Sequence, residues 1–391
     1  MSTLLLLALL LLAGLVAHLL VADAQDVPRD TGAGPVGGSG EAAGRLPSSV
    51  SVVVPARNEA ASLPLLLASL SALRTPAREV VVVDDGSDDG TAEIARAAGA
   101  TVIESGGPAP GWTGKAWACH RGATTATGST LLFLDADTVL APDALDGLLV
   151  LLGRHGGLVS VQPRHRAAQP YEQLSAYFNV MAVLASGAFS RRRPDPPMAY
   201  GPVLLTSVAD YEQAGGHAAV RAEVLDDVRL AAAYWRNGLG VRCFLGGGSI
   251  QMRMYPVGPR QLLEGWSKNI ASGAGAAHRW SALAAALWVA SHWAVTVGAL
   301  LLLASTVVGH RLTGVAHPAL YAVAWPAIAL QLRALLRRVG TFRWWTWAVF
   351  PLPLLAFTLI FARSTLLTTV RREVTWRGRR IPVVPGRRAS R

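Results

Sequence analysis

The stretch Leu131–Val139 constrains the fold more than any other part of this chain. Its large apolar side chains, Leu131–Leu134, predict a buried strand. Asp135 and Asp137 follow at the carboxyl end, where open α/β sheets bind their ligands. Residues i and i+2 of an extended segment project to the same side, so both carboxylates can reach one hard cation and the diphosphate that it carries. Alone, such a pair is more often a loop or a helix cap, so the rest of the chain decides.

Composition indicates a membrane-attached enzyme. Hydrophobic residues make up 51% of the 391, and the mean hydropathy is +0.35, although the middle of the chain is charged and rich in motifs. The net charge of +11 comes with arginines that are frequent from Arg333 onward and have little aromatic interleaving. This pattern predicts contact with an anionic membrane surface and argues against a nucleic-acid partner. Cys119 and Cys243 have neither CxxC spacing nor a nearby histidine, which argues against disulfides and zinc and favours buried cytosolic thiols.

The ends of the chain are predicted to lie in the cell membrane. Thr3–Ala22 carries no charge and is long enough to cross a bilayer, so we expect residues 1–25 to form an anchor. The alternative is a signal peptide cleaved near Ala24, but no lysine or arginine precedes the apolar run. A linker rich in Gly, Pro and Ser is expected over 26–47. Further apolar stretches at 281–309, 314–332 and 344–362, each long enough to span, predict a membrane region over 276–365, followed by a basic tail over 366–391.

The topology of these stretches is constrained by their arginines. A cytoplasmic catalytic domain followed by three crossings would place the basic tail outside, against the positive-inside rule, whereas the arginines between 333 and 343 favour a cytosolic second loop. We therefore expect a multi-pass protein in which one stretch is re-entrant or interfacial. The stretch 344–362, with Trp344 and Trp345 and the prolines Pro351 and Pro353, is the candidate.

Strands and helices alternate from residue 48 to about 275, which predicts an α/β catalytic domain. A strand over Val50–Val54, a helix over Ala60–Leu73 and strands over Glu79–Val83 and Thr101–Ile103 precede Leu131. Three parallel strands in this order are typical of a nucleotide-binding half-domain. The loop Asp84–Thr91 has the glycines of a tight turn and carboxylates that could hold a ribose or a base edge; a plain helix cap is the alternative.

The chain resembles a known enzyme family at three of these places. Segments 54–59, 83–87 and 134–137 resemble the first three motifs of family-2 glycosyltransferases, which have the GT-A fold. The resemblance implies an α/β, Rossmann-like catalytic domain that binds a nucleotide sugar, with Mg²⁺ or Mn²⁺ on the D-x-D pair. The donor-binding residues that it implies are Pro55, Arg57, Asn58, Glu59, Asp84, Asp85, Lys115 and Asp135, and the metal ligands are Asp135 and Asp137.

Further segments narrow the resemblance. Those at 111–120, 158–163, 200–203, 215–217 and 264–268 are similar to the bacterial diaponeurosporenoate glycosyltransferases of carotenoid synthesis. This similarity runs from about residue 48 to about 382, and related branches act on hopanoid or ceramide-like lipids. Lys115 lies in a glycine-flanked loop before a helix, where a cation can meet phosphates; a solvated surface lysine is the alternative.

The catalytic pair is predicted from residues 225–230. Asp226 and Asp227 match the family's Glu-Asp-x-x-Leu signature, with Asp226 in place of Glu, so the resemblance implies that Asp227 is the general base. Adjacent carboxylates repel, which would raise one pKa if the site is desolvated; on a surface helix they would only be solvated. His217 and Trp266 are candidates for acceptor binding. The alternatives are a structural hydrogen bond for His217 and a membrane-interface position for Trp266.

Two remaining segments bear on the acceptor. Residues 261–266 lack the arginine of the Gln-x-x-Arg-Trp motif with which polysaccharide synthases hold a growing chain, which argues against a polymerase. The apolar segment Tyr177–Phe189, followed by Arg191–Arg193, is either core or an interfacial helix that admits a lipid.

The predicted activity is therefore inverting transfer of a hexose, from UDP-glucose, to a membrane lipid such as a carotenoid acid. Hopanoid, ceramide-like or polyprenyl lipids are alternative acceptors. A catalytically silent, sugar-nucleotide-binding membrane scaffold is the alternative of another class.

Overall fold

The computed structural model describes residues 3–29, 49–223, 225–273, 278–309, 316–367, 373–376 and 379–382. Its internal contacts divide the chain into two units. The first comprises Met1–Ala24, His165–Pro194 and Met254–Arg391, and the second comprises Gln25–Arg164 and Asp195–Arg253. Residues 165–194 and 254–275, which we predicted to lie in the catalytic domain, thus group with the apolar helices. Most of the predicted linker and of the basic tail lies outside the described residues.

The second unit is built on a seven-stranded sheet of order β3-β2-β1-β4-β8-β6-β9. The strands are β1 (Val50–Ala56), β2 (Glu79–Asp84), β3 (Thr101–Glu104), β4 (Thr130–Leu134), β6 (Leu158–Gln162), β8 (Val203–Ser207) and β9 (Val241–Leu245). Strands β1, β2, β3 and β4 pair in parallel, as predicted. The sequence did not predict that β8 would lie antiparallel between β4 and β6. A mixed sheet therefore carries the predicted site.

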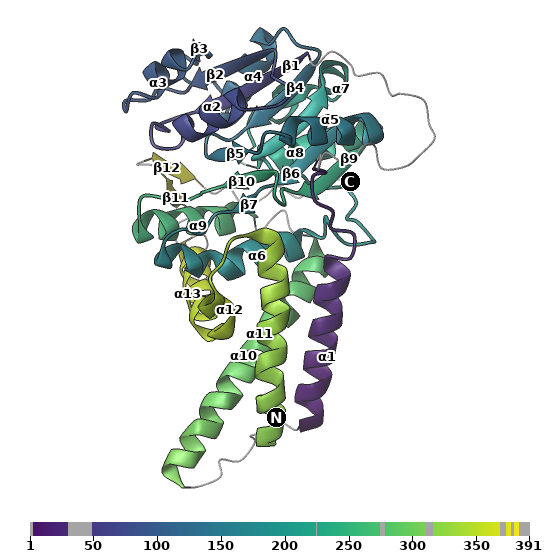
Figure 1. Cartoon of the computed structure of the whole chain (residues 1–391), viewed down its shortest axis with the longest axis vertical. Coiled ribbons are helices and arrows are strands. Elements are labelled where there is room, and N and C mark those ends of the chain that lie inside the picture. Colours follow the sequence, from purple (N-terminus) through teal and green to yellow (C-terminus); the bar gives the residue numbers. More distant parts are fainter. Residues whose placement is uncertain are drawn as a thin grey trace. The chain divides into compact units, whose positions relative to one another are not determined.

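Helices cover both faces of this sheet (Figure 1). One face packs on α2 (Leu63–Ser71), α3 (Thr91–Ala97) and α5 (Ala144–His155), and the other on α4 (Gly114–Thr125), α7 (Val208–Gln213) and α8 (Asp226–Arg236). In β4, Leu132 and Leu134 face the first layer, whereas Leu131 and Phe133 face the second. This two-sided burial explains why the strand is continuously apolar instead of alternating. Smaller elements are β5 (Thr138–Leu140), β7 (Arg164–His165), β10 (Ile250–Met252) and the 3₁₀ helix η2 (Gly216–Val220).

The start of the predicted linker is part of the second unit, which corrects the sequence prediction. Asp26 forms a parallel bridge with Leu245 at the end of β9, and Val27 donates its N–H to the Leu245 carbonyl at 2.9 Å. Val27 is buried, and Arg29 pairs with Asp143 at 3.5 Å. A single apolar residue among glycines and prolines gave no pattern from which this pairing could have been predicted.

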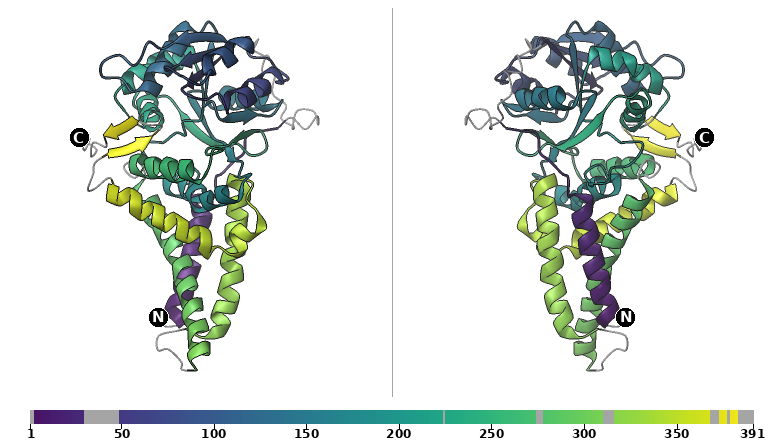
Figure 2. Two further views of the ribbon diagram at one scale, coloured as in Figure 1. Left: turned by 90° about the vertical axis from the view of Figure 1, so that its left-hand side faces the viewer. Right: turned by 90° about the vertical axis from the view of Figure 1, so that its right-hand side faces the viewer.

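The first unit is helical. Its elements are α1 (Thr3–Leu20), the 3₁₀ helix η1 (Pro170–Ser175), α6 (Ala176–Ser186), α9 (Pro259–Gly273), α10 (Arg279–Val308), α11 (Pro318–Val339), α12 (Trp344–Ala348), α13 (Pro351–Leu366) and the hairpin β11 (Glu373–Trp376) and β12 (Arg379–Pro382). Helices α1, α10 and α11 are long and apolar enough to cross a membrane. They lie side by side in Figure 2. The Trp288 indole donates to Gln331 at 2.8 Å, which links α10 to α11 through a hydrogen bond of the kind that joins helices in membranes.

The last apolar stretch is not one spanning helix, although it is long enough to have been one. It breaks after Ala348 into the 5-residue α12 and the 16-residue α13, because Pro351 begins a new helix and provides no N–H for the preceding one. Conversely, α11 continues through Arg333 and Arg338, which we had predicted to lie in a loop.

Candidate functional site

The loop after β4 fixes the first carboxylate of the D-x-D pair. Asp135 donates its N–H to the Pro202 carbonyl at 2.9 Å, and its own carbonyl accepts the Thr138 hydroxyl at 2.7 Å. Its Oδ1 lies 2.6 Å from Nζ of Lys115. Asp137 is half-buried, and its carbonyl accepts the N–H of Arg253 at 3.2 Å. Backbone contacts thus hold the two carboxylate-bearing residues at the carboxyl end of the strand.

Helix α4 supplies the positive charge of the site. The helix begins beyond Thr113, whose hydroxyl accepts the Ala116 N–H, so Lys115 stands in its first turn. Desolvation lowers the pKa of Lys115, but the carboxylates of Asp135 and Asp226 raise it further, so the net pKa lies above its ordinary value. The side chain remains 40% exposed. Lys115 is therefore a permanent cation that an incoming anion can contact.

Helix α8 begins with the two adjacent carboxylates. Asp226 is buried, and Asp227 accepts the N–H of Val228 at 2.9 Å and also the backbone N–H of Gly201. Burial, and next the charge of Asp226, raise the pKa of Asp227 to about 6, against the lowering effects of Lys115 and the two amides. The backbone of Gly201 approaches so closely that a Cβ there would lie 3.0 Å from Oδ2 of Asp227. Asp227 thus has the environment of a group that titrates near neutral pH.

His217 is a buried neutral side chain. It lies in η2, and its Nδ1 is 2.8 Å from the hydroxyl of Tyr211, which also accepts the His217 backbone N–H at 3.0 Å. Burial, with the charge of Lys115, lowers its pKa to about 3. His217 is therefore uncharged at neutral pH and can contribute hydrogen bonding but no positive charge to the site.

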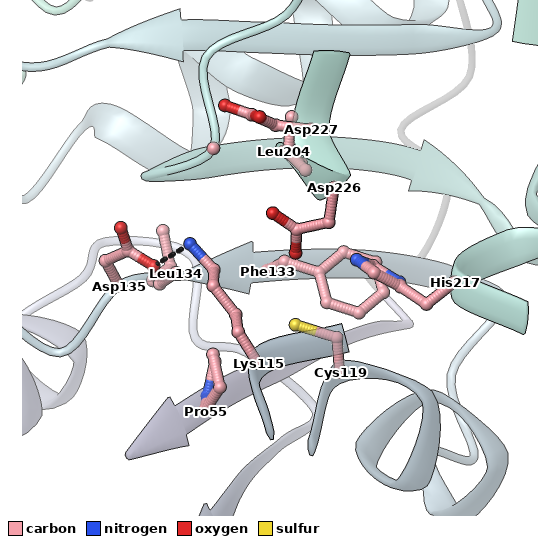
Figure 3. A pocket seen from close by; sticks show the side chains of 11 residues that line it. Pro55, Lys115, Cys119, Phe133, Leu134, Asp135, Leu204, His217, Asp226 and Asp227 are labelled. Carbon is pink, nitrogen blue, oxygen red and sulfur yellow. Dashed lines mark hydrogen bonds and ion pairs between the residues drawn. The ribbon is translucent and has the colours of Figure 1, made fainter. Parts of the chain in front are cut away.

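These side chains line one pocket of the second unit. It is lined by Pro55, Lys115, Cys119, Phe133, Leu134, Asp135, Gly201, Leu204, His217, Asp226 and Asp227. Figure 3 shows the Lys115 ammonium between the carboxylates of Asp135 and Asp226. Cys119, one helical turn after Lys115, was not predicted here, and burial raises the pKa of its thiol, so it stays protonated. Gly201, Leu204 and Phe133 were also missed, because apolar residues and glycines carry no chemical signature in a sequence.

The predicted nucleotide-binding residues form two interlocked loops beside the pocket. The N–H of Asn58 donates to the Ser87 hydroxyl at 2.9 Å, and the Asn58 side chain accepts the N–H of Asp88 at 3.0 Å. Glu59 donates its N–H to Thr91 at 2.9 Å. Asn58 has φ 52°, a left-handed conformation that asparagine tolerates better than most residues. These hydrogen bonds therefore fix the shapes of the two loops. Contacts with a nucleotide would have to come from groups that do not take part in them.

Asp84 and Asp85 differ in their surroundings. Asp84 caps its own loop by accepting from the Ser87 hydroxyl, a local structural role. Asp85 accepts the Ser105 hydroxyl at 2.9 Å and pairs with Arg57 at 3.5 Å. A Cβ on Gly114 would lie 2.5 Å from Oδ2 of Asp85, so the start of α4 closes on this carboxylate.

Trp266 is not among the pocket residues. It belongs to the first unit, where its side chain is buried, stacks on Phe178 with ring centroids 4.6 Å apart, and donates from Nε1 to the Ser175 hydroxyl at 2.9 Å. These contacts give it a packing role in α9, and acceptor binding by Trp266 stays a prediction.

The D-x-D pair suits a magnesium-like ion bound together with a diphosphate. Among the described residues, no cluster of three or more His, Cys, Asp or Glu side chains could hold a metal by itself. Carboxylate oxygens suit hard cations, and Mg²⁺ commonly takes only one or two carboxylates along with substrate phosphates and water. Asp135 and Asp137 therefore fit a metal that arrives with its ligand.

Comparisons with known proteins agree with this geometry. Residues 51–201 match the family described as Glycosyl transferase family 2. The chain is 35% identical over 343 residues to the 4,4'-diaponeurosporenoate glycosyltransferase of Staphylococcus aureus, covering 86% of this chain and 88% of that one. It is 38% identical over 253 residues to the enzyme of the same name from Staphylococcus haemolyticus, covering 63% of this chain and 67% of that one.

Among solved structures, a mannosyltransferase from Pyrobaculum calidifontis, in complex with GDP-mannose and Mn²⁺, is 20% identical with a TM-score of 0.52 and covers 91% of this chain and 95% of that one. This likeness confirms the predicted GT-A fold.

Proposed function

We propose that this chain, which belongs to glycosyltransferase family 2 and is an enzyme of that family, transfers glucose from UDP-glucose to the carboxylate of a carotenoid acid, with inversion at the anomeric carbon. The observation that carries the proposal is the pocket at the end of β4, where Lys115, Asp135, Asp226 and Asp227 converge. The similarity to diaponeurosporenoate glycosyltransferases over 86% of the chain supports the choice of acceptor.

In this proposal the donor lies along the carboxyl edge of β1, β2 and β4. The nucleotide contacts the interlocked loops through Arg57 and Asp85, and Lys115 meets the diphosphate. Asp135 and Asp137 hold Mg²⁺ or Mn²⁺, which when bound stabilises the negative charge of the departing nucleotide. Lys115 then exchanges its contact with Asp135 for one with phosphate, since both are within reach of its flexible side chain.

The acceptor approaches from the side of α8. An alcohol would have to lose a proton as it attacks, and Asp227, with a pKa of about 6, is suited to take it. His217 supplies a neutral hydrogen-bonding group to the same space. A lipid acceptor accounts for the helices α1, α10 and α11, which are able to cross a membrane. We propose a multi-pass arrangement with the second unit in the cytoplasm, where nucleotide sugars are made.

Transfer from labelled donors tests this activity. Membranes that contain the full chain are incubated with radiolabelled UDP-glucose, UDP-galactose or GDP-mannose, Mg²⁺ or Mn²⁺, and a C30 carotenoid acid, and the lipid extract is analysed. We expect label in a glycosyl ester with UDP-glucose. Transfer only to hydroxyl lipids would show that the acceptor is an alcohol and not an acid. Donor binding without transfer to any lipid would favour the scaffold function.

A further inference from the structure

The pocket holds an excess of negative charge. Within the described part of the chain, its lining residues include three carboxylates, Asp135, Asp226 and Asp227, against the one ammonium of Lys115. Lys115 pairs with Asp135 at 2.6 Å, and in the proposed donor complex it turns to the diphosphate, so in neither case is it an ion-pair partner of Asp227. A carboxylate acceptor would add another negative charge to this space. Like charges in a partly desolvated site repel strongly unless a proton or a cation lies between them.

Asp227 has no ion-pair partner among the described residues. Its hydrogen-bond partners are the backbone N–H groups of Val228 and Gly201. The Val228 bond uses Oδ1, and the close approach of Gly201 keeps the side chain in place. The charged and titratable groups around it in the pocket are Asp226 on the same helix, Lys115 and Cys119 on α4, Asp135 after β4, and His217 in η2.

We propose that Asp227 is protonated when the acid acceptor binds and donates its O–H to the acceptor carboxylate, so that it positions an anionic nucleophile instead of removing a proton. This inference rests on the proposed acceptor. It assigns the residue a different role for an acid than for an alcohol. Two carboxyl groups that share one proton form a short, strong hydrogen bond, which offsets the repulsion that the acceptor would otherwise meet.

The reaction then balances without a general base. An acceptor carboxylate oxygen forms the bond to the anomeric carbon as the bond from that carbon to the diphosphate oxygen breaks. The electron pair and the negative charge leave with the nucleoside diphosphate, and the product is a neutral ester. The proton on Asp227 stays on Asp227, because the nucleophile began as an anion and has none to give up.

The pH dependence has opposite signs for the two roles. As a base, Asp227 must be ionised, so kcat rises with pH through its pKa. As a donor it must be protonated, so kcat is highest below its pKa and falls as pH rises through it. The negative charge of the bound acceptor moves that pKa upward from about 6. With one enzyme, kcat should therefore fall as pH rises when the acceptor is the acid, and rise with pH when the acceptor is the alcohol.

The test uses the purified full chain, saturating UDP-glucose, the carotenoid acid and the same polyene reduced to its primary alcohol. With the acid, Asp227→Asn keeps an N–H donor and should lose at most about tenfold in kcat, whereas Asp227→Ala should lose about 10- to 100-fold, the worth of a hydrogen bond to a charged group. With the alcohol both variants should lose about 10²- to 10⁴-fold. Asp226→Asn is the matched control. Without the neighbouring charge the pKa of Asp227 is lower, so the fall of kcat with the acid should occur at lower pH.

The outcomes separate this inference from the proposed function. Transfer to the acid with a rate that rises with pH, or with equal losses in the Asn and Ala variants, would overturn the donor role and leave the function intact. Failure of the wild type to use the acid would overturn both. Binding of radiolabelled UDP-glucose to each variant shows that the pocket has folded, so a loss of rate cannot be misread as unfolding.

Discussion

The packing of α4 on the sheet offers a sharp test, because two glycines of similar helical setting differ in what surrounds them. A Cβ on the buried Gly122 would lie 2.3 Å from Cγ1 of Val53 in β1 and 3.1 Å from Cγ2 of Val83 in β2. Carbon atoms prefer about 3.5–4.0 Å, so α4 would have to move by about 1 Å. In contrast, a Cβ on Gly153 in α5 meets no atom within 4 Å.

The magnitudes follow from these distances. A contact as close as 2.3 Å places the overpacking cost in the upper part of its range, at about 2–3 kcal/mol. Alanine regains about 1 kcal/mol of helix propensity, so Gly122→Ala should lower the free energy of unfolding by about 1–2 kcal/mol. For a unit of this size, that is a fall in Tm of about 2–8 °C. Gly153→Ala should gain up to about 1 kcal/mol. Because α4 carries Lys115, the first change should also lower kcat.

The assay is tryptophan-fluorescence melting of the full chain in detergent, with transfer activity measured on the same samples. Gly153→Ala is the control for effects of the helix itself. A Gly122→Ala variant that melts at or above the wild-type temperature would refute the close seating of α4 on β1 and β2.

Three further predictions concern other parts of the chain. Asp135→Ala and Asp137→Ala should each abolish transfer while the protein stays in the membrane, since lost metal stabilisation costs several kcal/mol; more than about a tenth of the activity in both would contradict the metal assignment. Ser39→Cys should resist an impermeant thiol reagent in intact cells if the catalytic unit is cytoplasmic, and labelling would show the opposite orientation. Trp266→Phe keeps the stacking but loses the hydrogen bond to Ser175, so it should cost about 1 kcal/mol of stability. A raised KM for the acceptor with unchanged stability would contradict this packing role and support acceptor binding.

The sequence predicted those parts of the fold that depend on neighbouring residues in the chain. The strands β1, β2 and β4 were predictable because apolar runs such as Leu131–Leu134 are buried in the sheet, and an aspartate ends β2 and directly follows β4. The antiparallel β8 was not, because a run such as Val203–Ser207 specifies a strand but not its neighbours. The pairing of Val27 with Leu245 joins residues far apart in the sequence, and no periodicity marks it.

The site divides in the same way. Lys115, Asp135, His217, Asp226 and Asp227 were predicted from motifs and line one pocket. Their individual surroundings were not predictable, because the burial of Asp227 and the contact of Tyr211 with His217 depend on how α4, α7, α8 and η2 pack together. The sequence therefore predicted the candidate groups of the site, and the structure shows their burial and their hydrogen-bond partners.

The interlocking of the two loops predicted to bind the nucleotide bears on how donor choice can evolve. Asn58 both donates to Ser87 and accepts from Asp88, so neither loop has a conformation that is independent of the other. A mutation that reshapes one loop for a different base leaves the other without its partners. We therefore expect the two loops to be inherited as a pair. Exchanging residues 54–60 alone with a relative of different donor preference should give an inactive chimera, whereas exchanging 54–60 together with 84–91 should carry the preference across.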